Sequence, residues 1–253
     1  MYGDWCAITT TSSFCQSILI LSTFHFNEFV LNQFANAHKV GTDSMLLGAV
    51  INASNNKIAL DIGAGTGVLA LMLAQRNSSI KITCVEIDQK SAEECKNNVK
   101  KSPWFNRIET IHADFTQYHF QQNFDLIFTN PPYYFTDNSS SHGNSLQKHS
   151  TKEEFSAWIR ACYALLAPFG TFCMIYPHNQ EHVIAALTSA NKFHEQTRHV
   201  LLNQHQQAVR IISAYTKQAS PRMETNFSLR NQDGTYSDSY LELTKEFHAK
   251  TPL

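Results

Sequence analysis

Short apolar runs alternate with helix-like segments along the chain from residue 57 onward. The apolar runs have the length and composition of buried strands, and amphipathic or apolar helical segments stand between several of them. The strand-like runs cover residues 57–64, 81–88, 107–114, 124–130 and 170–177, and the helix-like segments cover 67–76, 89–102 and 151–166. This βαβ rhythm predicts an α/β fold with an open, mostly parallel sheet that helices cover on both faces.

Two further strands are expected near the C-terminus, at residues 197–203 and 209–217. The linker between them, NQHQQA, is too short for the helical crossover that parallel strands need. These two strands should therefore form an antiparallel hairpin. With the five preceding runs they give a sheet of seven strands.

Two segments depart from this pattern. Residues 134–150 are rich in Ser, Asn, Gly and His, and such long polar loops are commonly lids or binding loops. Residues 1–23 are poorly patterned, and we expect a disordered tail or an extension of the reading frame. Residues 24–253 are expected to form a single domain.

The composition narrows the class of protein. The chain has 253 residues, 43% of them hydrophobic, and a formal net charge of −1, so a polyanionic partner would have to meet a local patch. The six cysteines form no C-x-x-C pair and show no ligand-like spacing with histidines, which argues against a metal and favours the cytoplasm. No run of 18 apolar residues occurs, so no membrane span is expected.

A glycine-rich turn follows the first predicted strand. The segment DIGAGTG, residues 61–67, stands between a strand and a helix, where glycines let a ligand approach the backbone. Its spacing is G-x-G-x-G, because Val68 occupies the position where a dinucleotide fingerprint has its last glycine. The turn therefore argues against NAD, and a tight strand-to-helix connection is the alternative interpretation.

Acidic residues stand at the ends of the next two strands. Glu86 lies about 20 residues beyond the glycine turn, where a carboxylate can accept hydrogen bonds from both ribose hydroxyls of a nucleoside cofactor. Asp114 is placed to meet an adenine amino group, or to cap a following helix. Ligands of open α/β sheets bind outside the carboxyl ends of the strands, so these residues are expected to form one site with the glycines.

The strand-like run FDLIFT stops abruptly at Asn130-Pro131-Pro132-Tyr133. Two consecutive prolines cannot continue a helix or the ladder of a central strand. Such a strand end indicates a need for a rigid backbone, an amide side chain and an aromatic ring together. An Asn-Pro turn that merely ends the strand is the alternative.

The glycine turn, Glu86 and the Asn-Pro-Pro-Tyr segment together resemble the class I methyltransferases that use S-adenosylmethionine. The segment itself is similar to the motif of their amino-methylating branch, and the resemblance covers nearly all of residues 24–253. It implies a Rossmann-like fold. It also implies the following cofactor-binding residues: Asp61, Gly63, Gly65, Gly67, Glu86, Asp114 and Asn130.

The chemistry of amine methylation accounts for the motif that carries this resemblance. An exocyclic amine is a poor nucleophile because its lone pair is delocalised into the ring. Hydrogen bonds from its two N–H groups to the Asn130 side-chain oxygen and the Pro131 carbonyl would favour the tetrahedral geometry that attack requires. Neither proline carries an N–H that could compete, and Tyr133 would supply a face on which the target base stacks. No metal is needed.

Flanking segments are similar to those of the tRNA1(Val) adenine-37 N6-methyltransferase family. They include HKVGTDSMLLGAV (38–50), SPWFNRIETIHAD (102–114) and GTYSDSYLELTKEF (234–247). This resemblance places Lys39, Thr42 and Asp43 near the methionine end of the cofactor; a helix N-terminus capped by Asp43 is the alternative. The family commonly has Met and Gly where His38 and Ser44 stand. The implied substrate is N6 of an adenosine in the anticodon loop of a valine tRNA, and we expect a monomer.

The Asn-Pro-Pro-Tyr motif alone also admits other amine targets: adenine in DNA, guanine N2 in rRNA, or the glutamine amide of a release factor. A release-factor methyltransferase usually has a larger helical domain ahead of the first strand, which begins here at residue 57. A catalytically silent cofactor-binding or RNA-scaffolding module would be favoured by loss of Asn130 or the glycines. They are present.

One region is basic. Between residues 192 and 230, six cations face only Glu195 and Glu224, which gives a net charge of +4. The cations are Lys192, Arg198, Arg210, Lys217, Arg222 and Arg230. We expect this region to hold the tRNA backbone, and a hairpin with ordinary surface charge is the alternative.

Overall fold

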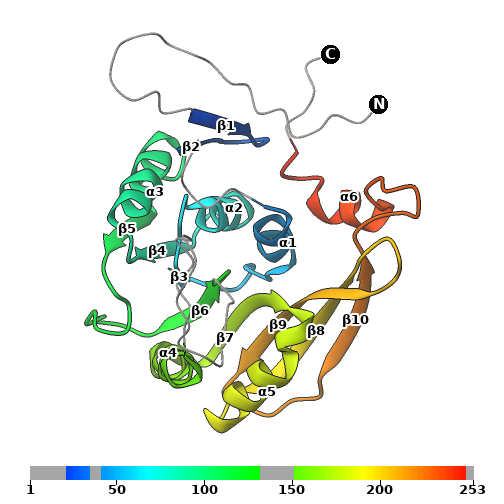
Figure 1. Ribbon diagram of the computed structural model, residues 1–253. Helices are drawn as coiled ribbons and strands as arrows, with labels where there is room; N and C mark the ends of the chain where they lie inside the picture. Colours follow the sequence, from blue (N-terminus) through cyan, green and yellow to red (C-terminus); the bar gives the residue numbers. More distant parts are fainter. Residues whose placement is uncertain (1–20, 35–40, 132–150, 249–253) are drawn as a thin grey trace, which may run out of the picture. The chain divides into compact units, whose positions relative to one another are not determined.

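The computed structural model describes residues 21–34, 41–131 and 151–248 (Figure 1). These residues form two compact units. Unit 1 consists of the described residues up to Tyr118 together with those from Leu241 onward, and unit 2 spans His119–Tyr240. The short helix α6 (Asp238–Thr244) contains the second boundary between them.

Unit 1 contains a parallel three-stranded β arrangement with helices in the connections. Its strands pair in the order β3-β4-β5. The elements in chain order are β3 (Ile58–Ile62), α2 (Val68–Arg76), β4 (Lys81–Glu86), α3 (Gln89–Lys101) and β5 (Ile108–His112), preceded by α1 (Thr42–Val50). The first three strands and two helices expected from the sequence are thus confirmed.

The sequences of α2 and α3 predict different patterns of burial, and the structure shows this difference. All residues of α2 from Val68 to Ala74 are buried, as expected for a helix that is apolar all round. Helix α3 is amphipathic and buries Ala92, Cys95 and Val99 at helical spacing. Its start is fixed by Asp88, whose carboxylate accepts a hydrogen bond of 2.9 Å from the Ser91 amide.

A hairpin that the sequence did not predict begins the described chain. Strands β1 (Leu21–His25) and β2 (Val30–Phe34) pair antiparallel. The buried Asn98 side chain of α3 ties β2 in place: its amide nitrogen donates to the Asn32 carbonyl at 2.9 Å, and its oxygen accepts from the Asn32 amide at 3.0 Å. Strand β1 takes in residues 21–23, whereas residues 1–20 lie outside the described residues. The expectation of a single domain over residues 24–253 stays a prediction.

Unit 2 contains five paired strands in the order β6-β7-β9-β8-β10. The pairs β6–β7 and β8–β10 are parallel, and the pairs β7–β9 and β8–β9 are antiparallel. The elements in chain order are β6 (Phe124–Thr129), α4 (Lys152–Leu165), β7 (Leu166–Pro177), the 3₁₀ turn η1 (His178–Gln180), α5 (Glu181–Ala190), β8 (His194–Leu202), β9 (Ala208–Thr216) and β10 (Met223–Ser228).

The C-terminal antiparallel hairpin is confirmed as β8 and β9. All seven expected strands occur, from β3 to β9, and β10 is an addition to them. Periodicity misses β10 because its first four residues, Met223–Asn226, are exposed, so no buried face marks it as a strand. The long polar loop expected at residues 134–150 lies outside the described residues.

Candidate cofactor and acceptor sites

The glycine turn of unit 1 joins β3 to α2 with three residues in the left-handed region. Gly63, Gly65 and Gly67 have φ values of +69°, +53° and +82°. A Cβ atom added at Gly63 or Gly65 would find nothing within 4 Å, so these two glycines leave open space beside the backbone. A Cβ at Gly67 would lie 2.9 Å from the Cys95 sulfur. The left-handed backbone favours glycine at all three positions, and close packing against α3 adds a second reason at Gly67 alone.

Glu86, the last residue of β4, accepts a hydrogen bond from the glycine turn. One carboxylate oxygen accepts a hydrogen bond of 2.9 Å from the Gly65 amide, and the other accepts one of 3.0 Å from the Asp88 amide. A carboxylate oxygen can accept more than one hydrogen bond, so both retain capacity for a ligand's hydroxyl groups. The pairing of the acid with the turn, inferred from their spacing, is present in the structure.

Ile87 follows Glu86 and is 50% exposed. It was not among the residues that the sequence singled out. An apolar side chain left open to solvent beside a carboxylate offers a flat planar ligand a surface to lie against. Its exposure is visible only in the folded chain, so the sequence carried no signal for it.

Asp61 lies in β3 with no exposed surface. Neither of its carboxylate oxygens has a hydrogen bond of good geometry. Burial, together with the nearby charge of Glu86, raises its pKa well above the ordinary value, and the Ala70 amide near the start of α2 offsets only part of this effect. A buried carboxylate without a partner is a site at which a cationic or hydrogen-bond-donating ligand group is stabilised.

Asp114 follows β5 and fixes a turn. Its carboxylate accepts hydrogen bonds from the Thr116 amide at 2.9 Å, from the Thr116 hydroxyl at 2.7 Å and from the Gln117 amide group at 3.1 Å. This is the capping role that the sequence left open. A contact with adenine stays a prediction, and it would have to share the carboxylate with these bonds.

Helix α1 begins at Thr42, and the backbone of Gly41 precedes it without a side-chain cap. Asp43 stands in its first turn, where a carboxylate interacts favourably with the helix dipole. The helix N-terminus that the sequence allowed is therefore present, but its N-cap is Gly41 and not the expected Asp43. Lys39, the other residue proposed near the methionine end of the cofactor, lies outside the described residues.

The acceptor motif belongs to unit 2. Asn130 and Pro131 follow directly after β6, whose Leu126, Ile127 and Phe128 side chains are completely buried. Both residues are half-buried at the carboxyl end of this strand, as the sequence predicted. Pro132 and Tyr133 lie outside the described residues, so the stacking role of Tyr133 stays a prediction.

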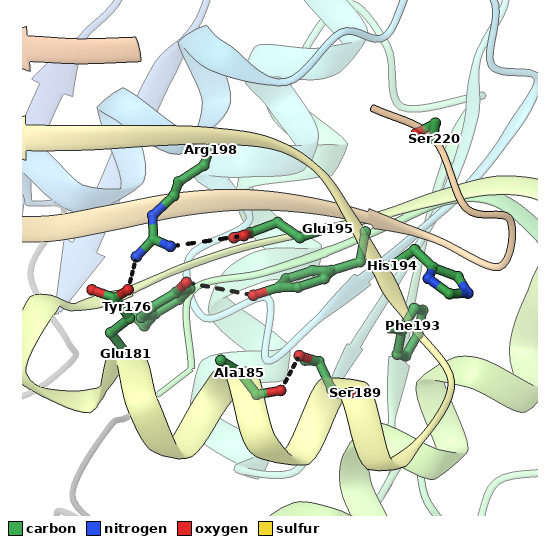
Figure 2. A pocket seen from close by; sticks show the side chains of 11 residues that line it. Tyr176, Glu181, Ala185, Ser189, Phe193, His194, Glu195, Arg198 and Ser220 are labelled. Carbon is green, nitrogen blue, oxygen red and sulfur yellow. Dashed lines mark hydrogen bonds and ion pairs between the residues drawn. The ribbon is translucent and has the colours of Figure 1, made fainter. Parts of the chain in front are cut away.

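Unit 2 also contains a cavity of about 270 Å³ between α5 and the β8–β9 hairpin (Figure 2). Arg198 lies at this cavity with only 8% of its surface exposed and forms ion pairs with Glu181, Glu195 and Glu224. Arg222 donates to Glu195 and Glu224, at 3.1 Å in each case. These two arginines, counted in the basic region of the sequence, are therefore neutralised by carboxylates.

A polar chain continues this cluster into the hairpin. Ser213 donates a hydrogen bond of 2.5 Å to Glu195 and lies 3.0 Å from the Tyr176 hydroxyl, which lies 3.4 Å from that of Tyr215. Figure 2 labels Tyr176, Glu195 and Arg198 of this cluster. Burial raises the pKa of both tyrosines, so they stay neutral at physiological pH. The cluster connects β7, β8 and β9 through side-chain hydrogen bonds.

Comparison with known proteins identifies the family. Residues 32–181 match the model of the methyltransferase small domain. The tRNA1(Val) (adenine(37)-N6)-methyltransferase of Escherichia coli O157:H7 is 34% identical over 237 residues, which are 92% of this chain and 97% of that protein. The protein of the same name from Tolumonas auensis is 31% identical and covers 90% of this chain and 97% of its own length. The chain belongs to this methyltransferase family.

Solved structures support the fold of this methyltransferase. A predicted O-methyltransferase from Agrobacterium tumefaciens superposes with a TM-score of 0.60 over 83% of this chain and 99% of its own, at 21% identity. The methyltransferase CcbJ of Streptomyces caelestis has a TM-score of 0.55 over 70% of this chain and 96% of its own, at 13% identity. The predicted Rossmann-like class I methyltransferase fold is thereby confirmed.

Neither a membrane-spanning helix nor a cluster of metal ligands occurs in the described part of the chain. None of the helices in residues 21–34, 41–131 and 151–248 has the length and apolar character to cross a membrane. Within the same ranges no three histidine, cysteine or acidic side chains are grouped so that they would bind a metal ion.

Proposed function

We propose that this methyltransferase transfers a methyl group from S-adenosylmethionine to N6 of adenosine-37 in tRNA1(Val). The observation that carries the proposal is similarity over 97% of the length of relatives that bear this name. The half-buried Asn130 and Pro131 at the end of a buried strand agree with an amine acceptor. The proposal includes a valine tRNA as the macromolecular partner, a monomeric enzyme and a cytoplasmic location.

The residues of unit 1 fit S-adenosylmethionine. Gly63 and Gly65 leave open space beside the backbone, where the methionine portion of the cofactor would lie. Glu86 has acceptor capacity for the two ribose hydroxyls, and exposed Ile87 offers a surface for the adenine ring. Asp61, which lacks a good hydrogen-bond partner, favours a positively charged group nearby. When bound, the cofactor supplies an electrophilic methyl group on its sulfonium.

The residues of unit 2 supply acceptors for the target amine. The Asn130 side-chain oxygen and the Pro131 carbonyl would accept hydrogen bonds from the two N–H groups of N6. These bonds strengthen as the nitrogen becomes tetrahedral and gains positive charge, so they act mainly in the transition state. Neither a nucleophilic side chain nor a covalent enzyme intermediate is part of this proposal.

A loop adenosine suits such a site. Bases in an RNA loop are only partly stacked, so turning one into a pocket costs less than flipping a base from a duplex, where the penalty is a few kcal/mol. Tyr133 is proposed as the face on which the extruded base stacks. Lys39 and Thr42 are proposed near the methionine end of the cofactor.

The test is to identify the methylated unit directly. The protein is incubated with labelled S-adenosylmethionine and, separately, with total tRNA, DNA and release factor, and the products are digested and analysed. We expect N6-methyladenosine at position 37 of the valine tRNA. Label in a release-factor glutamine, or in DNA with none in tRNA, would refute the proposed substrate and leave the family assignment intact.

A further inference from the structure

We propose that single-stranded RNA lies along one edge of unit 2, from Asn130 to Arg230, and that Arg230 binds a nucleotide several positions away from the target. The inference rests on the proposed function, because it names the surface that would hold the tRNA near its target adenosine. It is carried by strand register, by the packing of Arg230 and by the position of the remaining cations.

Strand register brings separate segments to the edge of unit 2 at which β6 ends and Asn130 lies. Strand β7 runs parallel to β6, so its last residue, Pro177, lies at the same edge. Pro177 pairs with Arg210 of β9, and Arg210 pairs with Leu201 near the end of β8. Strand β10 is parallel to β8 and ends beside it. The turn at residues 203–207 and the loop that begins at residue 229 therefore lie at this edge.

Side-chain contacts connect the turn at residues 203–207 to the strand end and loop around residues 228–234. Gln206 donates a hydrogen bond of 3.2 Å to the Ser228 hydroxyl, and a Cβ atom on Gly234 would lie 3.8 Å from the Gln204 side-chain oxygen. Within the turn, the Asn203 side chain accepts from the His205 amide at 2.8 Å. The turn and the loop thus form one polar surface.

Arg230 is held rigidly in this surface. Its guanidinium lies over the Tyr236 ring at 4.5 Å and donates a hydrogen bond of 2.6 Å to the Gly234 carbonyl. The other side of Tyr236 stacks on Tyr240, with ring centroids 4.3 Å apart and planes 13° apart, and Tyr240 is completely buried. A layered stack rooted in the interior therefore ends at an exposed arginine.

An exposed, oriented guanidinium is suited to RNA. It can stack on a nucleobase and interact with a phosphate, and it keeps its charge at any physiological pH. No carboxylate in the described part of the chain forms an ion pair with Arg230. The nearby Asp233 accepts hydrogen bonds from the amide and hydroxyl of Thr235 and so serves the loop itself.

The other cations of the basic region lie elsewhere. Lys192 precedes β8, Lys217 follows β9 and Arg222 precedes β10, which places all three at the opposite edge of the strands. Lys217 donates to the Leu166 carbonyl at 2.6 Å, and Arg222 pairs with Glu195 and Glu224. Of the six cations, only Arg210 and Arg230 are at the edge that carries Asn130.

Strand spacing sets the distance along this edge. Four steps between neighbouring strands, each about 4.8 Å, separate β6 from β10 by about 19 Å. Such a distance spans several nucleotides of a single strand. Arg230 therefore cannot contact the target base itself, and it would act on a flanking nucleotide.

The experiment compares three variants with unmodified tRNA and with an anticodon stem-loop. Arg230→Ala should weaken RNA binding roughly tenfold, the loss of one stacked base. It should also reduce the slope of log affinity against log salt by about 0.7, the value for one phosphate contact to a single strand. Arg230→Lys should keep the salt slope and recover only part of the affinity, because an ammonium has no planar face. The opposite-edge control, Arg222→Ala, should bind RNA as the wild type does.

An abasic scan of the stem-loop locates the contact. One abasic position away from the target should weaken wild-type binding and leave Arg230→Ala unaffected, which is the non-additivity of a direct contact. Unchanged melting temperature and S-adenosylhomocysteine affinity would show that the variant is folded. If the wild type methylates tRNA but Arg230→Ala binds it equally well, or Arg222→Ala loses as much, this inference is overturned. If the wild type transfers no methyl group to tRNA at all, the proposed function fails and the inference falls with it.

Discussion

The glycine turn of unit 1 and the basic region of unit 2 were both singled out in the sequence, and they fared differently in the structure. In unit 1, Glu86 and Gly65 stand 21 residues apart and are joined by a hydrogen bond, as their spacing indicated. In unit 2, the six cations of residues 192–230 do not form one patch. Two are neutralised in a carboxylate cluster, and the others are divided between two edges of the strands.

The difference lies in what fixes each position. A βαβ unit has one common handedness and short loops, so a strand end and the turn before it meet for local reasons. A hairpin residue acquires its neighbours from register, and a shift of one residue moves its side chain to the other face. Charge counted along a sequence therefore predicts a surface only where register is known.

The largest expected effect is a loss of stability when Arg198, in the carboxylate cluster of unit 2, is replaced. Arg198→Ala would leave Glu181, Glu195 and Glu224 without the buried cation between them, and breaking a buried ion pair in this way costs about 3–5 kcal/mol. Arg222→Ala removes a half-exposed partner of the same acids and should cost at most about 1 kcal/mol. Urea unfolding of both variants measures the difference. Equal losses would show that burial of Arg198 does not matter.

The next largest effect is expected on catalysis, when Asn130 of the acceptor motif is replaced. Asn130→Ala should lower kcat by a factor of about 10²–10³, the cost of removing one hydrogen-bonding group that acts in a transition state. Affinity for S-adenosylhomocysteine should fall far less than kcat, because the proposed bonds of the Asn130 side chain reach the acceptor base. Single-turnover methylation and calorimetry separate the two. Near-normal turnover in this variant would contradict the proposed role of Asn130.

Much of the fold was predictable because its signals are local. Buried strands β3, β4, β6 and β7 read as apolar runs, and helix α4 begins with a capping box between Thr151 and Glu154 that the sequence displays. The hairpin β1–β2 and the edge strand β10 were missed. Their stability comes from long-range partners, such as the bonds of Asn98 to β2 and the pairing of β10 with β8, and nothing in their own residues reveals these.

The candidate site, like the fold, was predictable only where its signals are local. Glycines, acids and the asparagine at strand ends were found by residue type and spacing. Ile87 was missed because its exposure, which marks it, is a property of the folded chain. The turn-capping bonds of Asp114 were one of two alternatives that the sequence left open, and they are visible only in the folded structure. The distinction between Gly65 and Gly67 also depends on the nearby Cys95 of α3.

The different surroundings of Gly65 and Gly67 allow a comparison of variants within the glycine turn. Glu86→Ala should weaken S-adenosylhomocysteine binding by about 1.5–3 kcal/mol, the contribution of a hydrogen bond to a charged group. Gly65→Val should weaken it as well, because a side chain would enter the open space and would be strained at φ +53°. Calorimetry measures both.

The control is Gly67→Ala, in which the added methyl meets the Cys95 sulfur. It should lower the free energy of unfolding more than it weakens ligand binding. Unchanged affinity in both Glu86→Ala and Gly65→Val would refute the cofactor assignment. A loss of affinity in Gly67→Ala as large as in Gly65→Val would show that the two glycines do not differ.

The smallest effect concerns Asp61, whose pKa is raised by burial and by Glu86. An acid with a raised pKa in the folded state binds its proton more tightly there than in the unfolded chain, so its ionisation destabilises the fold. The free energy of unfolding should therefore fall as pH rises from about 3.8, the ordinary value, through the raised pKa. Asp61→Asn cannot ionise, and the difference between its stability and that of the wild type should change in its favour over this range. Urea unfolding at several pH values tests this, and Asp88→Asn is a control of opposite sign, because hydrogen bonds from Ser91 lower the pKa of Asp88. A difference between Asp61→Asn and the wild type that does not vary with pH would mean that Asp61 does not titrate as its surroundings imply.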